Sequence, residues 1–493
     1  MKSLLIKPFA NYFQKQTLKV ARNAVADQQA IFKTLIKKAA NTQFGIDHNF
    51  NSIQTHKNFC HHVPIKDYEG QHEYFDRVKN GQSDILWPGK PRYLAKTSGT
   101  TSGVKYIPIS DDSIGNHINT ARNALFNFTS SRKDTSIFDG KLIFLSGSPI
   151  LTNVGGIKTG RLSGIVNHEI PAFVKGNQLP SYKTNCIEEW EEKLEKVIEE
   201  THNQDLRLIS GIPPWVQMYF ERLLDRTGKE TIKDVFPNLS LFVYGGVNYA
   251  PYRNTIENLI GDSIHSLETY PASEGFIAFQ DTVNNQGLLL NTNSGIFFEF
   301  VPANEIFDEN PTRLLLPDVE LDKDYAIIIN NNAGLWGYNI GDTIRFVSKD
   351  PYRLIVSGRI KHFISAFGEH VIAKEVEEAM TIVSKKYELQ INEFTVAPQV
   401  KAADGTLPHH EWFIEFETLP DNLTEVAKAL DEEMIRQNIY YQDLIVGNIL
   451  QPLKIKSLSK GSFNRYMESQ GKLGGQNKLP RLSNDRKMAD QLF

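Results

Sequence analysis

The chain has 493 residues, of which 40% are hydrophobic and 23% charged, as in an ordinary soluble globular protein of enzyme size. This length is too great for one core and predicts about two to four domains. The formal net charge of −4 gives no basic field for binding nucleic acid. The two distant cysteines, Cys60 and Cys186, indicate neither a disulfide framework nor a zinc site and fit a reducing cytoplasm.

Residues 3–41 have the spacing of an amphipathic helix. Its apolar face carries Leu18, Ala21, Val25, Phe32, Leu35 and Ala39. The polar face carries Gln and Asn as often as Lys, which favours a helix packed on the protein surface over a membrane-surface anchor. The apolar run at residues 4–6 is too short for a signal-peptide core, and no segment reaches the roughly 18 apolar residues of a membrane span. We therefore expect no membrane partner.

The segment 94–108 has two apolar flanks around a loop in which every residue from Thr97 to Gly103 is glycine or hydroxylated. This pattern predicts a strand, a polar loop and a second strand. A run of main-chain and hydroxyl donors could wrap a phosphate there: Ser98, Gly99, Thr100, Thr101 and Ser102. The loop is not a Walker A motif, because no Lys-Ser/Thr pair follows its second glycine. A plain polar turn is the alternative.

Strands and helices alternate through the middle of the chain. Residues 110–112 predict the capped start of a helix, and residues 141–145 predict a buried strand. The acidic segment 187–200 keeps its apolar residues on one face, so its glutamates are expected on a solvated helix face and not at a metal site. The segments 206–211 and 239–246 are further strands that stop at glycines. This order predicts an α/β architecture with its site at strand carboxyl ends.

A turn-like break at 348–352 precedes a second domain. Downstream, the patterns predict two helices and two strands, at 374–386, 422–438, 391–397 and 411–419. The stretch 457–482 is rich in Gly, Ser and Lys without an apolar period, so we expect a long functional or mobile loop. The expected domains are 1–357 and 358–493.

Three further motifs lie near expected strand ends. Residues 267–275, LETYPASEG, bring an aromatic ring, a hydroxyl and a carboxylate close together. Residues 338–346, YNIGDTIRF, place an aspartate at a Gly-Asp turn between two expected strands. Residues 357–364, SGRIKHFI, lie at the domain boundary. Taken singly, each has a plain alternative, namely a strand-end turn, a hairpin turn or a linker.

In this order, the hydroxyl loop and the three motifs resemble the adenylate-forming superfamily of acyl and aryl acid ligases. More narrowly, the chain resembles the auxin-responsive Gretchen Hagen family of acyl-acid amido synthetases, in its bacterial form. The resemblance spans about residues 40–482 and rests on the segments 42–45, 63–68, 97–103, 211–216, 270–275, 338–342, 410–412 and 474–482. It implies an α/β fold with a large N-terminal adenylation domain of mixed sheets flanked by helices, and a smaller, mobile α+β C-terminal domain.

The resemblance implies that the first two motifs bind ATP and Mg²⁺. The donors from Ser98 to Gly103 would grip the phosphates, with Thr100 acting in catalysis. The ring of Tyr270 would stack on adenine. Ser273 would bond the α-phosphate, and Glu274 would hold Mg²⁺, a cation that prefers oxygen ligands, and so act in catalysis.

The remaining ATP contacts implied by the resemblance come from three other segments. Asp342 would accept the ribose hydroxyls, and Arg359 would reach the ribose or a phosphate. Gly245 and Gly246 would let the backbone pass close to adenine. The acyl pocket is poorly defined: residues 213–215, Pro-Pro-Trp, either shape its wall or cap a strand.

The late catalytic lysine of the superfamily lies in a Gly-Lys-x-x-Arg loop. Here Lys478 and Arg481 keep that spacing, but Asn477 stands where the glycine is expected. Lys478 is therefore our candidate, with Lys460 as the runner-up and two solvated surface lysines as the plain alternative. The resemblance also puts Lys361 at the hinge about which the C-terminal domain rotates between half-reactions.

The implied reaction has two half-steps. A small carboxylic acid attacks the α-phosphorus of MgATP, pyrophosphate leaves and an acyl-adenylate forms. An amino-acid amine then attacks the acyl carbon, and AMP departs. Two alternatives remain: a thioester-forming ligase that uses coenzyme A, and a non-catalytic nucleotide-binding relative, which would have no chemical need for a Mg²⁺ carboxylate.

Other chemistries lack their motifs. The sequence has no Gly-x-Ser-x-Gly elbow, no His-Glu-x-x-His and no Gly-x-Gly-x-x-Gly. The histidine pairs at 61–62 and 409–410 are adjacent, and neighbours on a strand point to opposite faces, so joint metal ligation is not expected.

Overall fold

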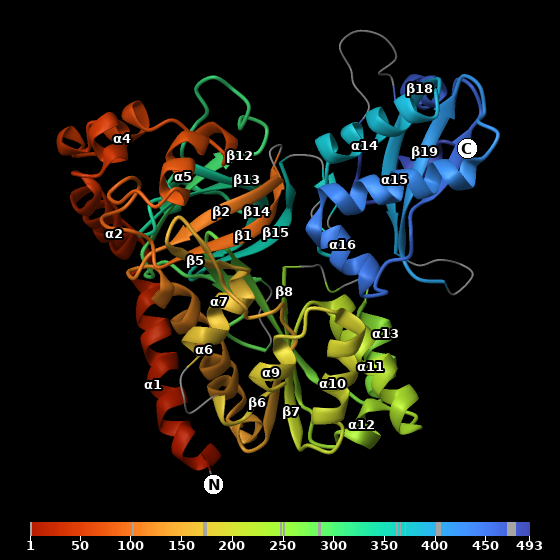
Figure 1. The fold of residues 1–493 in the computed structure, drawn as a ribbon. Helices are drawn as coiled ribbons and strands as arrows, with labels where there is room; N and C mark the ends of the chain where they lie inside the picture. Colours follow the sequence, from red (N-terminus) through yellow and green to blue (C-terminus); the bar gives the residue numbers. More distant parts are fainter. Residues whose placement is uncertain are drawn as a thin grey trace. The chain divides into compact units, whose positions relative to one another are not determined.

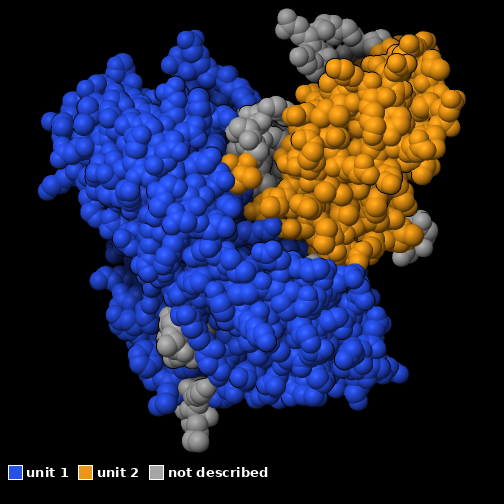
Figure 2. Space-filling model, in the orientation of Figure 1, with its two compact units in different colours: residues 1–97, 105–360 blue, residues 98–104, 361–493 orange. Residues whose placement is uncertain are grey.

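The computed structural model describes residues 2–100, 103–170, 175–246, 249, 252–283, 287–360, 363–364, 366–369, 371–400, 406–470 and 480–493 (Figure 1). The chain divides into two compact units (Figure 2). The first comprises residues 1–97 and 105–360, and the second comprises residues 361–493 and the short segment 98–104.

An eleven-stranded mixed sheet organises the first unit. In spatial order its strands are β12 (Ile296–Pro302), β13 (Asp324–Asn331), β14 (Tyr338–Lys349), β15 (Tyr352–Arg359), β11 (Leu288–Leu290), β10 (Gly275–Phe279), β9 (His265–Ala272), β8 (Leu241–Gly245), β7 (Leu206–Ser210), β3 (Lys141–Phe144) and β6 (Gln178–Leu179). From β9 to β6 neighbours run parallel, and from β12 to β9 they run antiparallel. The parallel strands read as short apolar runs because helices cover both faces of such sheets.

A second, four-stranded sheet belongs largely to the same unit. Its order is β2 (Gly103–Ile109), β1 (Tyr93–Thr100), β5 (Ile157–Gly160) and β4 (Thr152–Val154). The expected pair of strands around the hydroxyl loop is thus present as β1 and β2. Because β1 extends to Thr100 and β2 begins at Gly103, both strands reach further into the hydroxyl run than the sequence suggests.

Helices surround these sheets. They are α1 (Lys2–Arg22), α2 (Ala24–Ala39), α3 (Gln43–Asp47), α4 (His56–His62), α5 (His72–Lys79), α6 (Ile114–Arg132), α7 (Leu162–Glu169), α9 (Tyr182–Asn185), α10 (Trp190–Thr201), α11 (Pro213–Thr227), α12 (Ile232–Val235) and α13 (Arg253–Ile260). Short 3-10 turns lie at Phe50–Ser52, Glu69–Gln71, Ser136–Phe138, Leu316–Asp318 and, in the second unit, Ala489–Gln491. The expected acidic helix is α10, and its glutamates at 191 and 192 are exposed.

The predicted N-terminal helix is two helices, interrupted at Asn23, whose backbone leaves the helical region at φ −101° and ψ 12°. The first of them packs on the protein as expected, along α6 (Figure 1). Phe13 stacks on Phe126 at 5.3 Å between ring centroids, and Asn127 donates to Thr17 at 2.9 Å. Among the helices that the structure describes, none is long and apolar enough to cross a membrane.

The second unit is built around a three-stranded sheet. Its elements are β16 (Phe363–Ile364), β17 (Val371–Ile372), α14 (Ala373–Lys386), β18 (Ile391–Gln399), β19 (His409–Phe416), α15 (Leu423–Gln437), α16 (Ile439–Val446), β20 (Lys454–Leu458) and α17 (Ser462–Ser469). Strand β19 pairs antiparallel with β18 and parallel with β20. All four elements expected between 374 and 438 are present. The α/β fold class, with a large unit of mixed sheets and a smaller α+β unit, is confirmed.

Three local expectations were wrong. The expected loop 457–482 contains helix α17, because Phe463 and Tyr466, one turn apart, pack into the core of the second unit. The expected turn within 338–346 is part of the continuous strand β14, in which Gly341 has φ +89° and the pairing with neighbouring strands shifts register. The histidine pair at 61–62 ends helix α4 and is not on a strand.

The start of β14 is fixed by an aromatic core. Trp336 is fully buried, makes an edge contact with Phe50 at 4.8 Å and donates from its indole nitrogen to the Leu86 carbonyl at 3.0 Å. Gln71 donates to the Trp336 carbonyl at 2.8 Å. These contacts hold the backbone that leads into Tyr338, and therefore determine where the third motif begins.

Candidate functional site

The second and third motifs meet inside the first unit. The Tyr270 hydroxyl on β9 donates to Asp342 Oδ2 on β14 at 2.5 Å, and both side chains are buried, with 7% and 9% exposed. Three strands separate β9 from β14 in the sheet order. The sheet must therefore curve strongly to bring these side chains into contact.

The turn between β9 and β10 carries Ser273 and Glu274, and two asparagines hold it. Asn116 of α6 accepts from the Phe276 amide at 2.6 Å and donates back to its carbonyl at 3.3 Å. Asn331, at the end of β13, donates to the Glu274 carbonyl at 2.8 Å. Because the Glu274 carbonyl and both backbone groups of Phe276 are bonded to other elements, the turn has little freedom to move.

Glu274 lies near Tyr338, the first residue of β14. Burial raises the pKa of the Tyr338 phenol well above its ordinary value, and the negative charge of Glu274 raises it further. The tyrosine is fully buried, whereas Glu274 is half-buried. The phenol therefore stays protonated at any physiological pH beside a carboxylate that reaches solvent.

A small hollow of about 10 Å³ borders this carboxylate, with room for about one water molecule. Its wall includes Ser273, Glu274, Asn331 and His117. Burial lowers the pKa of His117 to about 4, so its ring is neutral at pH 7. Among the residues that the structure describes, nothing bonds its Nδ1 atom. A polar ligand atom or water in the hollow fits this buried nitrogen.

Strand β15 places Arg359 opposite Asp342. The two residues are Cα partners in the β14–β15 ladder, and the Ile360 amide donates to the Gly341 carbonyl at 2.8 Å. The side chain of Arg359 lies outside the described part of the structure. Its backbone position nevertheless brings the third and fourth motifs onto neighbouring strands.

Gly245 and Gly246 end β8 for two different reasons. A Cβ atom on Gly245 would lie 2.4 Å from the Thr269 carbonyl oxygen, so glycine is required for β8 to pair with β9. Gly246 is exposed, has φ +78° and has open space where a Cβ would point. Only Gly246 therefore leaves the backbone accessible, whereas Gly245 is explained by strand packing.

The hydroxyl loop is described only in its backbone. Ser98, Gly99 and Thr100 end β1 and Gly103 begins β2, while their side chains, and all of Thr101 and Ser102, lie outside the described residues. Strand β2 is held to the first unit at Tyr106, whose amide donates to the Tyr68 hydroxyl at 3.1 Å.

The family-like segments 42–45 and 63–68 are structural supports. Thr42 caps α3 by accepting from the Gly45 amide at 3.1 Å, and a Cβ on Gly45 would lie 2.1 Å from the Ala39 carbonyl. Lys66 pairs with β14 through its backbone, donating to Gly337 at 3.0 Å and accepting from Asn339 at 2.9 Å. These segments position β14 and do not themselves enter the Tyr270–Asp342 cluster.

The second unit carries the two candidate lysines. Lys460 is an exposed residue that forms an ion pair with Glu417, and Lys478 lies outside the described residues. The chain just after Lys478 is anchored: Arg481 pairs with Glu377 at 3.1 Å, and the Pro480 carbonyl accepts from Thr395 at 2.8 Å. The hinge candidate Lys361 also lies outside the described residues.

Two further sequence candidates have structural explanations. Pro213 and Pro214 form the first turn of α11, where a missing amide hydrogen costs no helical bond. His410 contacts Glu369 at 2.8 Å, whereas His409 lies 3.7 Å from Glu411, so the two imidazoles have different partners as expected.

Sequence reasoning missed Asn116, His117 and Asn331. Asn116 lies 160 positions from the backbone it holds, and no motif marks it. The only signal was a run of three asparagines, 330–332, at the end of the apolar strand β13. Polar residues at a strand end are common, so this signal alone does not identify a site.

Comparison with solved structures defines the class. The chain superposes on the GH3.15 acyl acid amido synthetase with a TM-score of 0.61 and 16% identity, covering 97% of this chain and 95% of that one. It also superposes on a 2-hydroxyisobutyryl-CoA ligase with a TM-score of 0.56 and 13% identity, covering 98% and 91%. The chain therefore shares the fold of these two ligases.

Family models identify the branch. Residues 13–184 match the GH3 family N-terminal domain, residues 289–359 its central domain and residues 374–487 its C-terminal domain. The chain belongs to the GH3 family, which confirms the Gretchen Hagen resemblance. A jasmonoyl–L-amino acid synthetase of Nicotiana attenuata, JAR4, is 21% identical, covering 91% of this chain and 89% of that protein. The indole-3-acetic acid-amido synthetase GH3.4 of Arabidopsis thaliana is 22% identical, covering 94% and 90%.

Proposed function

We propose that this protein is an ATP-dependent acyl-acid amido synthetase, which activates a small carboxylic acid as an acyl-adenylate and transfers the acyl group to an amino acid. Membership of the GH3 family and the amido synthetase activity in the names of its relatives support the reaction class. The contact between Tyr270 and Asp342 is the structural observation that carries the proposal, because it joins the two motifs assigned to ATP.

In this proposal, ATP binds in the first unit around β9, β14 and β15. The Asp342 carboxylate accepts the ribose hydroxyls and is oriented for this by the hydrogen bond from Tyr270. The ring of Tyr270 forms the adenine platform, beside the accessible backbone of Gly246. Arg359, opposite Asp342 in the ladder, reaches the ribose or a phosphate.

Mg²⁺ fits the environment of Glu274, a half-buried carboxylate on a turn anchored by Asn116 and Asn331. When bound, the ion neutralises charge on the phosphates of ATP during displacement of pyrophosphate. Ser273, on the same turn, supplies a hydroxyl to the α-phosphate. The loop from Ser98 to Gly103 supplies donors to the outgoing phosphates, with Thr100 among them.

Lys478 is the proposed catalytic lysine of the adenylation step. Two and three positions after it in the sequence, Pro480 and Arg481 are held by bonds to Thr395 and Phe394. The exposed Lys460–Glu417 ion pair gives the runner-up a structural role of its own. An Nζ cation contributes by stabilising negative charge on the α-phosphate as the acid oxygen attacks.

The test is ATP–pyrophosphate exchange with a panel of carboxylic acids, followed by product analysis with amino acids or coenzyme A as acceptor. Amide formation supports the proposal. Exchange followed only by thioester formation would assign the chain to the coenzyme A ligases that share its fold. Nucleotide binding without exchange for any acid would make it a non-catalytic relative.

A further inference from the structure

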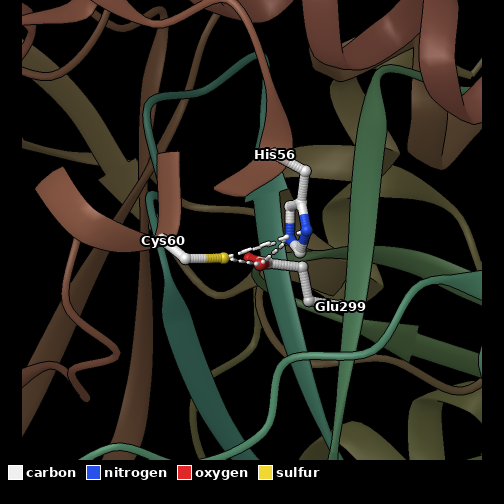
Figure 3. Close-up of side chains that lie close together, drawn as sticks. All are labelled: His56, Cys60 and Glu299. Carbon is white, nitrogen blue, oxygen red and sulfur yellow. Dashed lines mark hydrogen bonds and ion pairs between the residues drawn. The ribbon is translucent and has the colours of Figure 1, made fainter. Parts of the chain in front are cut away.

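A second cluster of reactive side chains lies in the first unit, away from the residues assigned to ATP. His56 and Cys60 stand one helical turn apart on α4, and Glu299 projects from β12 toward both (Figure 3). Cys60 Sγ lies 3.3 Å from His56 Nε2 and 3.8 Å from Glu299 Oε1, and the histidine nitrogen lies 2.7 Å from that oxygen.

Such a His-x-x-x-Cys pair with a carboxylate has the composition of a metal site, but the carboxylate is already saturated. Oε1 of Glu299 faces His56 Nε2 at 2.7 Å and Arg313 Nε at 2.8 Å. Oε2 accepts from Arg313 Nη2 at 2.7 Å and from Asn330 Nδ2 at 2.8 Å. A carboxylate offers about four lone-pair positions. A cation would have to displace one of these donors and approach the Arg313 guanidinium, which disfavours it.

The same contacts keep His56 charged. Burial alone lowers the pKa of His56, but its bonds to Cys60 and Glu299 outweigh burial and raise it to about 9. Burial raises the pKa of Glu299, but Arg313 and His56 together lower it to about 2. At pH 7 His56 is therefore an imidazolium whose Nε2 faces both the Glu299 carboxylate and the Cys60 sulfur.

Cys60 is the reactive residue of this network that reaches solvent. Cys60 is partly exposed, whereas Glu299 is fully buried. The thiolate is the nucleophilic form of cysteine, and a neighbouring imidazolium or guanidinium stabilises its charge. The chain holds one other thiol, Cys186, also partly exposed, which serves as an internal reference; the basic group near it is the amine of Lys193, whose pKa burial lowers to about 8.

We propose that Cys60 is a site of oxidation by hydroperoxides, activated by His56. After its proton has passed to water, the Cys60 sulfur attacks, as thiolate, the hydroxyl oxygen of the hydroperoxide; an S–OH bond forms and the O–O bond breaks. The electron pair leaves with the second oxygen as alkoxide or hydroxide, which takes a proton from the His56 imidazolium. The sulfur is oxidised by two electrons to a sulfenic acid, and the peroxide is reduced to an alcohol or water.

The network also connects Cys60 to β14. Arg313 donates to the Val63 carbonyl at 2.5 Å, at the start of the segment that pairs with Gly337 and Asn339 through Lys66. Asn330, bonded to Glu299, accepts from the Gly337 amide at 2.6 Å. An oxygen added to Cys60 enlarges the group beside the saturated Glu299 carboxylate. The contacts through Arg313 and through Asn330 both connect Glu299 to the strand that carries Asp342.

The primary test compares the two thiols in the full-length protein. Cys60 is the sole thiol of the Cys186→Ser variant, and Cys186 is the sole thiol of the Cys60→Ser variant. Each is treated with limiting hydrogen peroxide and dimedone at pH 7, and adduct formation is followed by intact mass. We expect Cys60 to react at least about tenfold faster, as thiols beside a cation do. His56→Gln in the Cys186→Ser background should lower that rate to near that of Cys186.

Equal rates for the two thiols would overturn the proposal, and this comparison does not require the His56 variant to fold. Stoichiometric, dialysis-resistant binding of Zn²⁺ that blocks labelling of Cys60 would also overturn it, in favour of a metal site. These measurements are independent of enzymatic activity, so their failure is distinguishable from failure of the proposed function.

A second readout rests on the proposed function and tests the connection to β14. Peroxide should lower pyrophosphate exchange in Cys186→Ser, dithiothreitol should restore it, and Cys60→Ser should be unaffected. Equal loss in both variants would place the damage elsewhere and overturn the connection.

Discussion

Tyr270 and Asp342 share a 2.5 Å hydrogen bond although 72 positions separate them in the chain and three strands separate them in the sheet. The bond is possible because the antiparallel half of the sheet curves back on itself. A substitution at either residue therefore alters a contact of both motifs. For the proposed ATP site, this couples the adenine platform to the carboxylate that accepts the ribose.

Replacing Asp342 by alanine should nearly abolish adenylation. Loss of one charged contact in a site of this kind costs about 2.7–4 kcal/mol of transition-state stabilisation, so we expect pyrophosphate exchange to fall about 10²- to 10³-fold. The change also takes an acceptor from the buried Tyr270 hydroxyl, at about 1–3 kcal/mol of stability. Tyr270→Phe keeps the ring and should lower exchange by less than about tenfold. A near-normal rate in Asp342→Ala would remove this carboxylate from the site.

Glu274→Gln should impair the use of Mg²⁺ while leaving the turn intact. The hydrogen bond from Asn331 reaches the backbone carbonyl of Glu274, so it survives the substitution. We expect exchange to fall about 10²-fold or more, with the magnesium concentration for half-maximal rate displaced upward. Glu268 of β9 lies six positions before Glu274 and is also half-buried, so Glu268→Gln is a matched control. Equal losses in both variants would contradict a metal role for Glu274.

The sequence allowed the fold class, most elements and the family to be predicted, because apolar periodicity and turn residues are local signals. Helix α17 was missed because its single buried aromatic turn lies among Gly, Ser and Lys. The continuity of β14 was missed because a Gly-Asp pair is typical of a turn. In the structure, Gly341 has a positive φ within a strand whose pairing is irregular.

The candidate site could be predicted only as a set of motifs. Nothing local in the sequence indicates that Tyr270 contacts Asp342, or that Asn116 bonds to Phe276. Both contacts depend on the curvature of the sheet and on the packing of α6 against β10. Long-range geometry of this kind comes from the whole core, and so the supporting asparagines carried no signal of their own.

Asn116→Ala tests one of these supports. The substitution removes the acceptor of the Phe276 amide, whereas Asn291 still donates to the Phe276 carbonyl at 3.3 Å, so we expect a loss of about 1–3 kcal/mol in the free energy of unfolding. Exchange activity should fall as well, because the turn carrying Ser273 and Glu274 loosens. Asn119→Ala changes an exposed residue of the same helix and should alter neither quantity. The measurements are urea unfolding and pyrophosphate exchange on both variants.

The His56 network should make stability fall at alkaline pH. The pKa of His56 is raised in the folded protein from 6.5 to about 9, so its stabilisation is full below pH 6.5 and is lost as the pH rises through 9. Cys60 and Glu299 are the titratable groups that face it, and Arg313 pairs with the far side of Glu299. The free energy of unfolding should drop by up to about 3 kcal/mol over this range. When the free energy of unfolding in urea is measured against pH, His56→Gln should lack that part of the decline. Parallel pH curves for the variant and the wild type would contradict the raised pKa of His56.

The last prediction concerns the segment between the two units. The chain is fixed to β14 up to Ile360, whose amide donates to Gly341 at 2.8 Å, and the second unit begins at Lys361. A rotation of the C-terminal domain between half-reactions would therefore have to be absorbed at about Lys361. Lys361→Pro fixes φ near the proline value and removes a backbone donor, while Lys361→Ala removes only the side chain. We expect the proline variant to lose amide formation far more than pyrophosphate exchange. In the alanine variant, the ratio of amide formation to pyrophosphate exchange should be close to that of the wild type. Equal loss of both activities in Lys361→Pro would mean that this segment is ordinary connecting chain.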